Sequence, residues 1–208
     1  MISDSISSAT APASAGPVAL LLLAAGASTR MGRPKQLLPY HGRTLLRHAA
    51  ETAVASGCAP RVLVAGALYS ELLPEVAGLD FSVVRNDVWA SGMGSSIVAG
   101  LTALEAHHPA LAAVVVMLCD QPLLTADIIQ QLKQQFFSTG QPVVATAYAG
   151  IRGVPALFSR TTFAELRTLA GATGARDLLR RYAHLPTVAF ADGTLDVDTA
   201  AQYAALAQ

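Results

Sequence analysis

The chain has 208 residues, of which 52% are hydrophobic and 13% are charged. This length and composition predict one well-buried globular domain and exclude a chain that is disordered throughout. Fourteen basic and fourteen acidic residues cancel to a formal net charge of zero, so no overall positive field favours nucleic acid or an anionic membrane as a partner.

Residues 1–16 are mostly serine, alanine and other small residues, which offer little apolar surface to bury. We therefore expect a disordered tail over residues 1–16 and a single domain over residues 17–208. The tail lacks the basic start of a signal peptide, and the apolar run from Val18 to Ala25 is shorter than the ~20 residues that a membrane helix needs. Cys58 and Cys119 are expected to be two buried thiols, and these features together favour a cytoplasmic protein.

Apolar runs typical of buried strands recur along the chain. They lie at Val18–Ala25, Arg61–Gly66, Phe81–Val84, Ala112–Leu118 and Pro142–Tyr148. Residues 43–56 and 95–106 lie between such runs and repeat apolar side chains at helical spacing. Alternating strands and helices predict an α/β fold with a doubly wound, mostly parallel sheet and helices on both faces.

After Tyr148 the pattern loosens into a strand-like segment at residues 153–158 and a helix that Thr162 and Glu165 would start as a capping box. Further helices are expected near residues 175–182 and after Thr199, which would cap the last one. We find no internal repeat and no linker between domains.

The first strand-like run leads into a loop of small residues that carries three cations, Arg30, Arg33 and Lys35. Ligands of such folds bind beyond the carboxyl ends of the strands, where free backbone N–H groups suit a phosphate. The loop lacks the G-x-G-x-x-G pattern of dinucleotide-binding proteins, and its spacing differs from that of a P-loop. The residues alone therefore indicate an anion such as a triphosphate, with an ordinary surface loop as the alternative.

The segment from Leu23 to Lys35 reads L-A-A-G-x-S-x-R-M-G-x-P-K. It resembles the signature of the nucleotidyltransferases that activate cofactors and sugar phosphates, and in particular that of the molybdenum cofactor cytidylyltransferases. The resemblance implies a Rossmann-like fold and a loop whose backbone holds the triphosphate of a nucleotide. In this family Arg30 would meet the β- and γ-phosphates and Lys35 the α-phosphate. The loop residues implied in nucleotide binding are Leu23, Ala24, Ala25, Gly26, Ser28, Arg30 and Lys35.

Later segments extend the resemblance to the C-terminus. Asn86–Leu101 resembles the family's segment around base and ribose, which implies nucleotide contacts for Asn86, Gly92 and Ser95. The D-Q-P turn at Asp120 resembles its metal-binding turn, and D-V-D-T at Asp196–Thr199 its final metal-side turn.

Asp120 and Asp196 are accordingly expected to share one Mg²⁺ ion, with Asp198 as the next candidate. Asp120 follows the most apolar strand, where a ligand residue is expected, although an aspartate there can also simply cap a turn. We expect the two carboxylates on the same rim as the glycine loop, with oxygens within roughly 3–6 Å of each other. Arg152 and Arg176 are candidates for the acceptor phosphate, although Arg176 can also pair with Asp177 or Glu165 on a helix surface.

The resemblance implies an enzyme that transfers CMP from CTP to the terminal phosphate of the molybdenum-pterin cofactor and releases pyrophosphate, with Arg30, Lys35 and Asp120 as its catalytic residues. An apo-molybdenum hydroxylase would receive the product. The attacking phosphate oxygen is already anionic, so a general base is not required. The five histidines offer no persuasive base and are interpreted as solvated.

Three alternatives stay open. The first is a guanylyltransferase on the same cofactor, against which Ala25 speaks because guanylyl members carry a second glycine there. The second is a nucleotidyltransferase that acts on another phosphorylated small molecule. The third is a non-catalytic carrier of the pterin cofactor for a hydroxylase, against which Lys35 and Asp120 speak.

Overall fold

The computed structural model describes residues 16–171, 174–182 and 184–206, so residues 1–15, most of the expected tail, lie outside it. A seven-stranded sheet with the strand order β5-β4-β1-β6-β8-β7-β9 crosses the molecule. Its strands are β1 (Val18–Leu23), β4 (Arg61–Ala65), β5 (Ser82–Arg85), β6 (Ala113–Leu118), β7 (Val143–Tyr148), β8 (Ile151–Ser159) and β9 (Thr187–Ala189). A small hairpin of β2 (Pro39–Tyr40) and β3 (Arg43–Thr44) stands apart from it.

The sheet is mostly parallel, as the sequence predicts. Strand β1 pairs in parallel with β4 and β6, β4 with β5, and β7 with β9. Strand β8 runs antiparallel to both of its neighbours, β6 and β7. Because β6 and β7 both oppose β8, they point the same way. The carboxyl ends of β1, β4, β6 and β7 therefore meet at one rim of the sheet.

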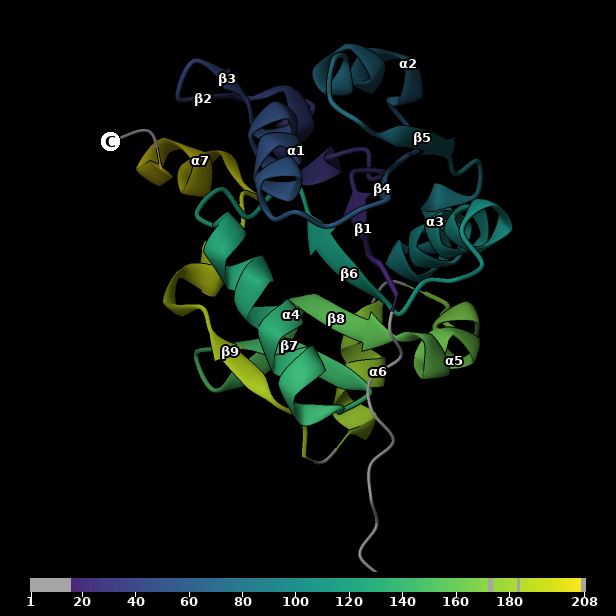
Figure 1. Ribbon diagram of the computed structural model, residues 1–208. Helices are drawn as coiled ribbons and strands as arrows, with labels where there is room; N and C mark the ends of the chain where they lie inside the picture. Colours follow the sequence, from purple (N-terminus) through teal and green to yellow (C-terminus); the bar gives the residue numbers. More distant parts are fainter. Residues whose placement is uncertain (1–15, 172–173, 183, 207–208) are drawn as a thin grey trace, which may run out of the picture.

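Helices cover both faces of the sheet (Figure 1). They are α1 (Leu45–Ala55), α2 (Tyr69–Leu72), α3 (Met93–His107), α4 (Ala126–Thr139), α5 (Phe163–Arg167), α6 (Ala175–Arg181) and α7 (Ala200–Leu206). Helices α1 and α4 pack on one face, and α3, α5 and α6 pack on the other. The doubly wound α/β architecture is confirmed. No helix in the described ranges has both the length and the apolar character needed to cross a bilayer.

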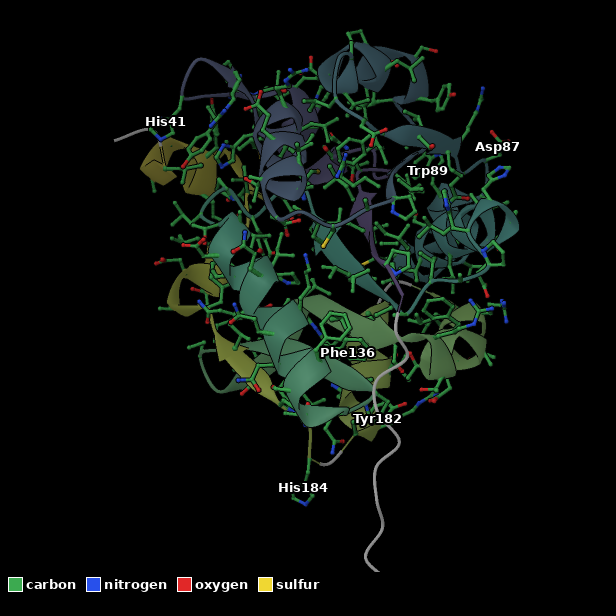
Figure 2. All side chains as sticks on the ribbon, in the orientation of Figure 1. His41, Asp87, Trp89, Phe136, Tyr182 and His184 are labelled. Atoms are coloured by element: carbon green, nitrogen blue, oxygen red, sulfur yellow. The ribbon has the colours of Figure 1, made fainter. Side chains whose placement is uncertain are left out.

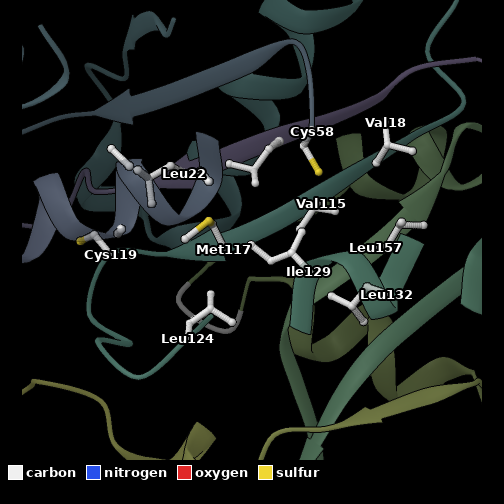
Figure 3. Close-up of a cluster of buried hydrophobic side chains, with 14 of the residues drawn as sticks. Val18, Leu22, Cys58, Val115, Met117, Cys119, Leu124, Ile129, Leu132 and Leu157 are labelled. Atoms are coloured by element: carbon white, nitrogen blue, oxygen red, sulfur yellow. The ribbon is translucent and has the colours of Figure 1, made fainter. Parts of the chain in front are cut away.

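The uninterrupted apolar sequence of β1 follows from burial on both faces. Leu20 and Leu22 lie in the core under α1 and α4, whereas Leu21 and Leu23 lie in the core under α3, α5 and α6. Figure 3 shows part of the first core, with Leu22 and Met117 from adjacent strands. Cys58 and Cys119 are buried free thiols, as expected.

Two of the expected helix caps have different outcomes. Thr199 caps α7, because its Oγ1 accepts a hydrogen bond from the Gln202 N–H at 3.3 Å. The capping box at Thr162 is wrong: no side chain caps α5, and the Thr162 hydroxyl instead donates to the Ser159 carbonyl at 2.8 Å. A 3₁₀ turn at Arg160–Thr162 runs directly into α5, so Thr162 has helical backbone angles that a capping residue does not have.

Candidate active site

A cavity of about 320 Å³ opens beyond the carboxyl ends of β1 and β6. Its volume lies at the low end of the roughly 300–1,000 Å³ that small-molecule sites occupy. Figure 2 shows Trp89, one of its walls, between β5 and α3. The lining residues come from the first loop, the segment after β5 and the end of β6: Leu23, Ala24, Ala25, Gly26, Lys35, Gln36, Trp89, Ala90, Gly92, Met93, Ser96, Leu118, Cys119 and Asp120.

Gln36 organises the loop after β1, although the sequence analysis did not single it out. Its side chain is 1% exposed, and its Nε2 donates to the carbonyls of Ala24 at 3.1 Å and Gly26 at 2.7 Å. Its Oε1 accepts from the Ser28 hydroxyl at 2.9 Å, and that hydroxyl accepts from the Lys35 N–H at 3.1 Å. These bonds fix a loop in which Ser28 takes a left-handed backbone conformation with φ of 55°.

The same loop leaves backbone donors unused. The N–H groups of Ala25 and Gly26 make no hydrogen bond to another described residue, while both residues line the cavity. Backbone N–H groups that converge in a tight loop at the end of a parallel strand form a site for an anion. Ser28 is one of the residues expected to bind the nucleotide, and its hydroxyl is used in hydrogen bonds inside the loop.

Lys35 stands between two carboxylates. Its Nζ lies 2.5 Å from Asp120 Oδ2 and 2.7 Å from Asp198 Oδ1, and its side chain is 17% exposed. Burial alone would lower the pKa of Lys35, but the charge of Asp120 and the hydrogen bonds to Asp120 and Asp198 outweigh it and raise that pKa. The lysine is therefore positively charged at any physiological pH.

Asp120 and Asp196 come together although 76 residues separate them in sequence. The Val197 N–H donates to the Asp120 carbonyl at 2.9 Å, which brings the turn after β9 to the end of β6. Oδ1 of Asp120 and Oδ1 of Asp196 are both buried without a described hydrogen-bond partner. Burial, followed by the charge of Asp120, raises the pKa of Asp196 from 3.8 to about 6. The separation of 3–6 Å between their oxygens stays a prediction.

These unpaired carboxylate oxygens have the chemistry that a hard divalent cation prefers. In the described ranges, no group of three or more His, Cys, Asp or Glu residues is placed so that it could hold a metal ion. An ion here would take two protein carboxylates and complete its coordination with water or with phosphate oxygens, as Mg²⁺ usually does.

The segment after β5 positions Trp89 through a buried asparagine. Asn86 is 3% exposed, and its Nδ2 donates to the hydroxyls of Ser95 at 2.9 Å and Ser96 at 3.0 Å, while its Oδ1 accepts from the Val88 N–H at 3.1 Å. Asn86 and Ser95, both expected to contact the nucleotide, thus bond to each other beneath this segment. Of the three nucleotide residues expected here, Gly92 lines the cavity.

Gly66, the residue after β4, is a second feature that the sequence analysis missed. A Cβ atom at this position would lie 2.6 Å from the Ala25 carbonyl and 2.7 Å from the Trp89 side chain. Only glycine therefore lets the glycine loop and the tryptophan approach each other from opposite sides of β4. The signal was a glycine directly at the end of a predicted strand.

Arg33, the cation of the first loop that precedes Lys35, points away from the cavity. Arg30 lies in the 3₁₀ turn Thr29–Met31, and its side chain is outside the described part of the structure. The Arg33 guanidinium lies over the ring of Tyr203, 5.3 Å from its centroid, and does not line the cavity. Lys35 lines the cavity, and Arg33 does not.

His48 departs from the expectation of solvated histidines. It is half-buried on α1, and its Nε2 lies 2.8 Å from the Pro122 carbonyl in the turn that carries Asp120. Burial lowers the pKa of His48, so the ring is held neutral and can donate to that carbonyl. The contact ties α1 to the Asp120 turn.

A second cavity of about 210 Å³ adjoins the first, sharing Met93 and Leu118 as walls. It is lined by Met93, Leu118, Gln121, Tyr148, Gly153, Val154, Ala175, Arg176, Leu179 and Asp196. Asp120 borders the first cavity and Asp196 the second, so the carboxylate pair lies at their junction. Arg176 reaches the second cavity, whereas Arg152 does not and donates to the Tyr182 carbonyl at 2.7 Å.

Comparison with known proteins gives a family match over most of the domain. The model of the MobA-like NTP transferase domain matches residues 20–186. A protein of Paenarthrobacter nicotinovorans named nicotine blue oxidoreductase is 37% identical over 172 residues, which cover 77% of this chain and 80% of that protein. The molybdenum cofactor cytidylyltransferase of Escherichia coli K12 is 27% identical over 181 residues, which cover 86% of this chain and 90% of that enzyme.

Solved structures give the same result for the fold. The crystal structure of Rv0371c from Mycobacterium tuberculosis H37Rv is 31% identical with a TM-score of 0.79, and the match covers 93% of this chain and 98% of that one. A second structure of Rv0371c, described as a complex with manganese, is 30% identical with a TM-score of 0.74, over 91% of this chain and 97% of that one.

Proposed function

The chain belongs to the family of MobA-like NTP transferase domains, and on this premise we propose that it transfers CMP from CTP to the terminal phosphate of a molybdenum-pterin cofactor. The observation that carries the proposal is the position of Lys35. Its charged ammonium group stands between the carboxylates of Asp120 and Asp198, near the junction of two cavities and beside a loop with unused N–H groups. This arrangement fits a reaction between two phosphate groups, one in each cavity.

The first cavity is the proposed nucleotide site. The unused N–H groups of Ala25 and Gly26 would bind the triphosphate, and Lys35 would approach the α-phosphate. Arg30 is assigned to the β- and γ-phosphates on its position in the family motif. Trp89 would lie against the base, since it forms a flat apolar wall of the same cavity.

Asp120 and Asp196 would hold a divalent metal ion through their unpaired Oδ1 atoms. Mg²⁺ is the proposed ion, and the complex of Rv0371c with manganese supports a divalent ion in this family. When bound, such an ion supplies positive charge to the triphosphate oxygens. The residues of the chain would orient the α-phosphate and reduce its electrostatic repulsion with the incoming phosphate.

The transfer itself needs no proton removal by the protein. An oxygen of the acceptor phosphate, already anionic, forms a bond to the α-phosphorus, while the bond between the α- and β-phosphates breaks and pyrophosphate leaves with the bonding electrons. Repulsion between these anions is the main barrier, so positioned cations and N–H dipoles are the main source of catalysis. This matches a cavity whose described lining includes half-buried Lys35 and contains no histidine.

The molybdenum-pterin acceptor is proposed from the named activity of the E. coli relative, and CTP over GTP from Ala25 in the loop motif. An apo-molybdenum hydroxylase is the proposed recipient of the product. A redox reaction is the second candidate function. The reason is that the protein named nicotine blue oxidoreductase is 37% identical to this chain, whereas the E. coli cytidylyltransferase is 27% identical. Against this candidate, the first loop lacks the glycine pattern that binds the pyrophosphate of a nicotinamide dinucleotide.

Isothermal titration of the full-length protein with CTP, GTP, UTP and NADPH in the presence of Mg²⁺ separates these functions. The proposed function predicts that CTP binds most tightly, and that its binding weakens when Mg²⁺ is replaced by a chelator. Preferred binding of GTP would assign the guanylyl reaction, and binding of NADPH alone would assign the redox function. A pure carrier would bind no nucleotide specifically.

A further inference from the structure

Tyr148 is a buried residue with an unused hydroxyl at the rim of the site. It ends β7, is 9% exposed, and packs its ring edge-on against Phe190 at a centroid distance of 6.1 Å. Among the described residues, its hydroxyl has no hydrogen-bond partner. Tyr148 lines the second cavity, so its hydroxyl is available to a ligand bound there.

Two glycines make the space for this ring. A Cβ atom at Gly153 would lie 2.2 Å from the Tyr148 hydroxyl oxygen, and one at Gly193 would lie 2.4 Å from Tyr148 Cδ1. Neither glycine has a positive φ angle, so space, and not backbone conformation, requires glycine at both positions. A residue larger than glycine at position 153 or 193 would therefore occupy the space that the Tyr148 ring fills.

The hydroxyl end of the ring lies at the second cavity. Gly153, against which the hydroxyl rests, lines this cavity together with Gln121 and Asp196. Gln121 is 4% exposed, its Nε2 donates to the Val154 carbonyl at 3.2 Å, and its Oε1 has no hydrogen-bond partner. The second cavity is thus lined by a tyrosine and a glutamine whose hydroxyl and amide oxygen, respectively, have no hydrogen-bond partner among the described residues.

We propose that Tyr148 is a specificity-determining residue for the acceptor, to which its hydroxyl donates a hydrogen bond in the second cavity beside Gln121 Oε1. The inference rests on the proposed function and adds the chemistry of the acceptor. A ligand that accepts from Tyr148 and donates to Gln121 carries an N–H group near an acceptor atom, as the amide-like edge of a nitrogen heterocycle does. Arg176, exposed at the same cavity, suits a negative charge on that ligand.

The hydroxyl keeps its proton for this role. Burial, followed by the negative charge of Asp196, raises the pKa of Tyr148 above its usual value of 10. The phenol therefore stays a donor over the whole neutral range. A phenylalanine at this position would fill the same slot and remove only the hydroxyl.

The test compares Tyr148→Phe with Tyr182→Phe in the full-length protein. Tyr182 is a matched control, because its hydroxyl donates to Glu165 Oε1 at 2.9 Å outside both cavities, and Figure 2 shows it beside α6 and far from Trp89. The probe is molybdopterin, the pterin phosphate of the proposed molybdenum-pterin acceptor, titrated without nucleotide and then used as the substrate with CTP. Tyr148→Phe should weaken molybdopterin binding and raise its KM about tenfold, with kcat and the KM for CTP unchanged. Tyr182→Phe should leave all four quantities unchanged.

Each other outcome is decisive. Wild-type affinity for molybdopterin in Tyr148→Phe overturns the inference, and so does an equal loss of CTP affinity, which would indicate a packing role. If the wild-type protein binds molybdopterin but transfers no CMP, the proposed function fails while the two titrations still decide the role of Tyr148. If the wild-type protein does not bind molybdopterin at all, the inference is wrong, and the nucleotide titration above tests the transferase separately.

Discussion

The two cavities at the rim differ in how their polar groups are satisfied. Around the first cavity, Gln36 and Asn86 are buried, and their side-chain amides form hydrogen bonds within the protein. Around the second, Tyr148 and Gln121 keep a hydroxyl and an amide oxygen without a described partner. On the proposed function, the nucleotide site is preformed and binds through backbone N–H groups, whereas the acceptor site relies on side chains that the acceptor itself must satisfy.

Lys35 and Asp120 stand where the two regions meet. Their ion pair, extended to Asp198, connects the glycine loop with the turn after β9. Variants on either side of this pair, and variants of the pair itself, should therefore give separable effects. We expect the largest effect at the pair and the smallest at the chain terminus.

Lys35→Ala should lower turnover with CTP about 10²–10³-fold, because it removes the charge that faces the α-phosphate during transfer, a loss of roughly 2–4 kcal/mol in comparable sites. Steady-state kinetics beside CTP titration should show a much smaller change in CTP affinity. Lys133→Ala is the control, since the Lys133 ammonium group donates to the Ser56 carbonyl away from both cavities. An unchanged turnover number would remove Lys35 from the catalytic residues.

Gln36→Ala tests whether the nucleotide loop is preformed. The substitution leaves the Ala24 and Gly26 carbonyls without their buried donor, so the free energy of unfolding should fall by roughly 1–3 kcal/mol and CTP binding should weaken. Chemical denaturation and titration measure the two effects. The matched control is Gln130→Ala, whose amide makes one exposed bond of 3.4 Å to the Ala55 carbonyl. Equal stability of the two variants would contradict the role given to Gln36.

Asp196→Asn should stabilise the metal-free protein as pH rises. The folded-state pKa of Asp196 is raised from 3.8 to about 6, so its favourable contribution is complete below pH 3.8 and is lost as pH rises through 6. The asparagine variant avoids that loss. At pH 8 its free energy of unfolding should exceed that of wild type by about 1 kcal/mol, a value reduced because the side chain is partly exposed to solvent. Near pH 4 the two proteins should be equally stable. Thermal melts in a chelator measure this difference.

Two further results complete the Asp196 test. Exposed Asp192 provides the control variant Asp192→Asn, which should show no such pH dependence. Added Mn²⁺ should raise the melting temperature of wild type but not of Asp196→Asn, because a ligand that binds only the folded state stabilises it. A stability difference that does not grow with pH would show that burial and the charge of Asp120 do not raise the pKa of Asp196 in the folded protein.

Deletion of residues 1–15 should have the smallest effect. The segment has almost no large apolar side chains to bury, so we expect an unchanged melting temperature and unchanged CTP affinity. Differential scanning calorimetry of the shortened chain checks this. A fall of several degrees would mean that the segment packs on the domain.

The fold could be predicted from the sequence because its strands are buried on both faces. Such strands leave uninterrupted apolar runs, as at Val18–Leu23 and Ala113–Leu118, and the alternation with helices then sets the topology. The start of α5 was not predictable in this way. Local sequence allows a capping box at Thr162, but the chain continues from a 3₁₀ turn and leaves no residue free to cap.

Much of the candidate site depends on contacts that no local pattern contains. Gly66 matters because Ala25 and Trp89 approach it from distant segments, and Gly153 matters because Tyr148 lies against it. Lys35 contacts the carboxylate of Asp198, 163 residues away in sequence, and no local pattern predicts that pairing. Lys35 and Asp120 stand out in the sequence through the motifs that resemble the family, and the parallel pairing of β1 with β6 explains why the segments after these strands lie at one rim.

The central claim is tested most directly by analysing the products formed from CTP and molybdopterin. The wild-type protein with Mg²⁺ should form one cytidine dinucleotide of the cofactor for each pyrophosphate released, separated by chromatography, and Asp120→Asn should form neither at a comparable rate. Asp192→Asn removes a carboxylate that lines neither cavity, so this variant should match wild type. Release of pyrophosphate without the dinucleotide, or dinucleotide formation that Asp120→Asn leaves unchanged, would contradict the account.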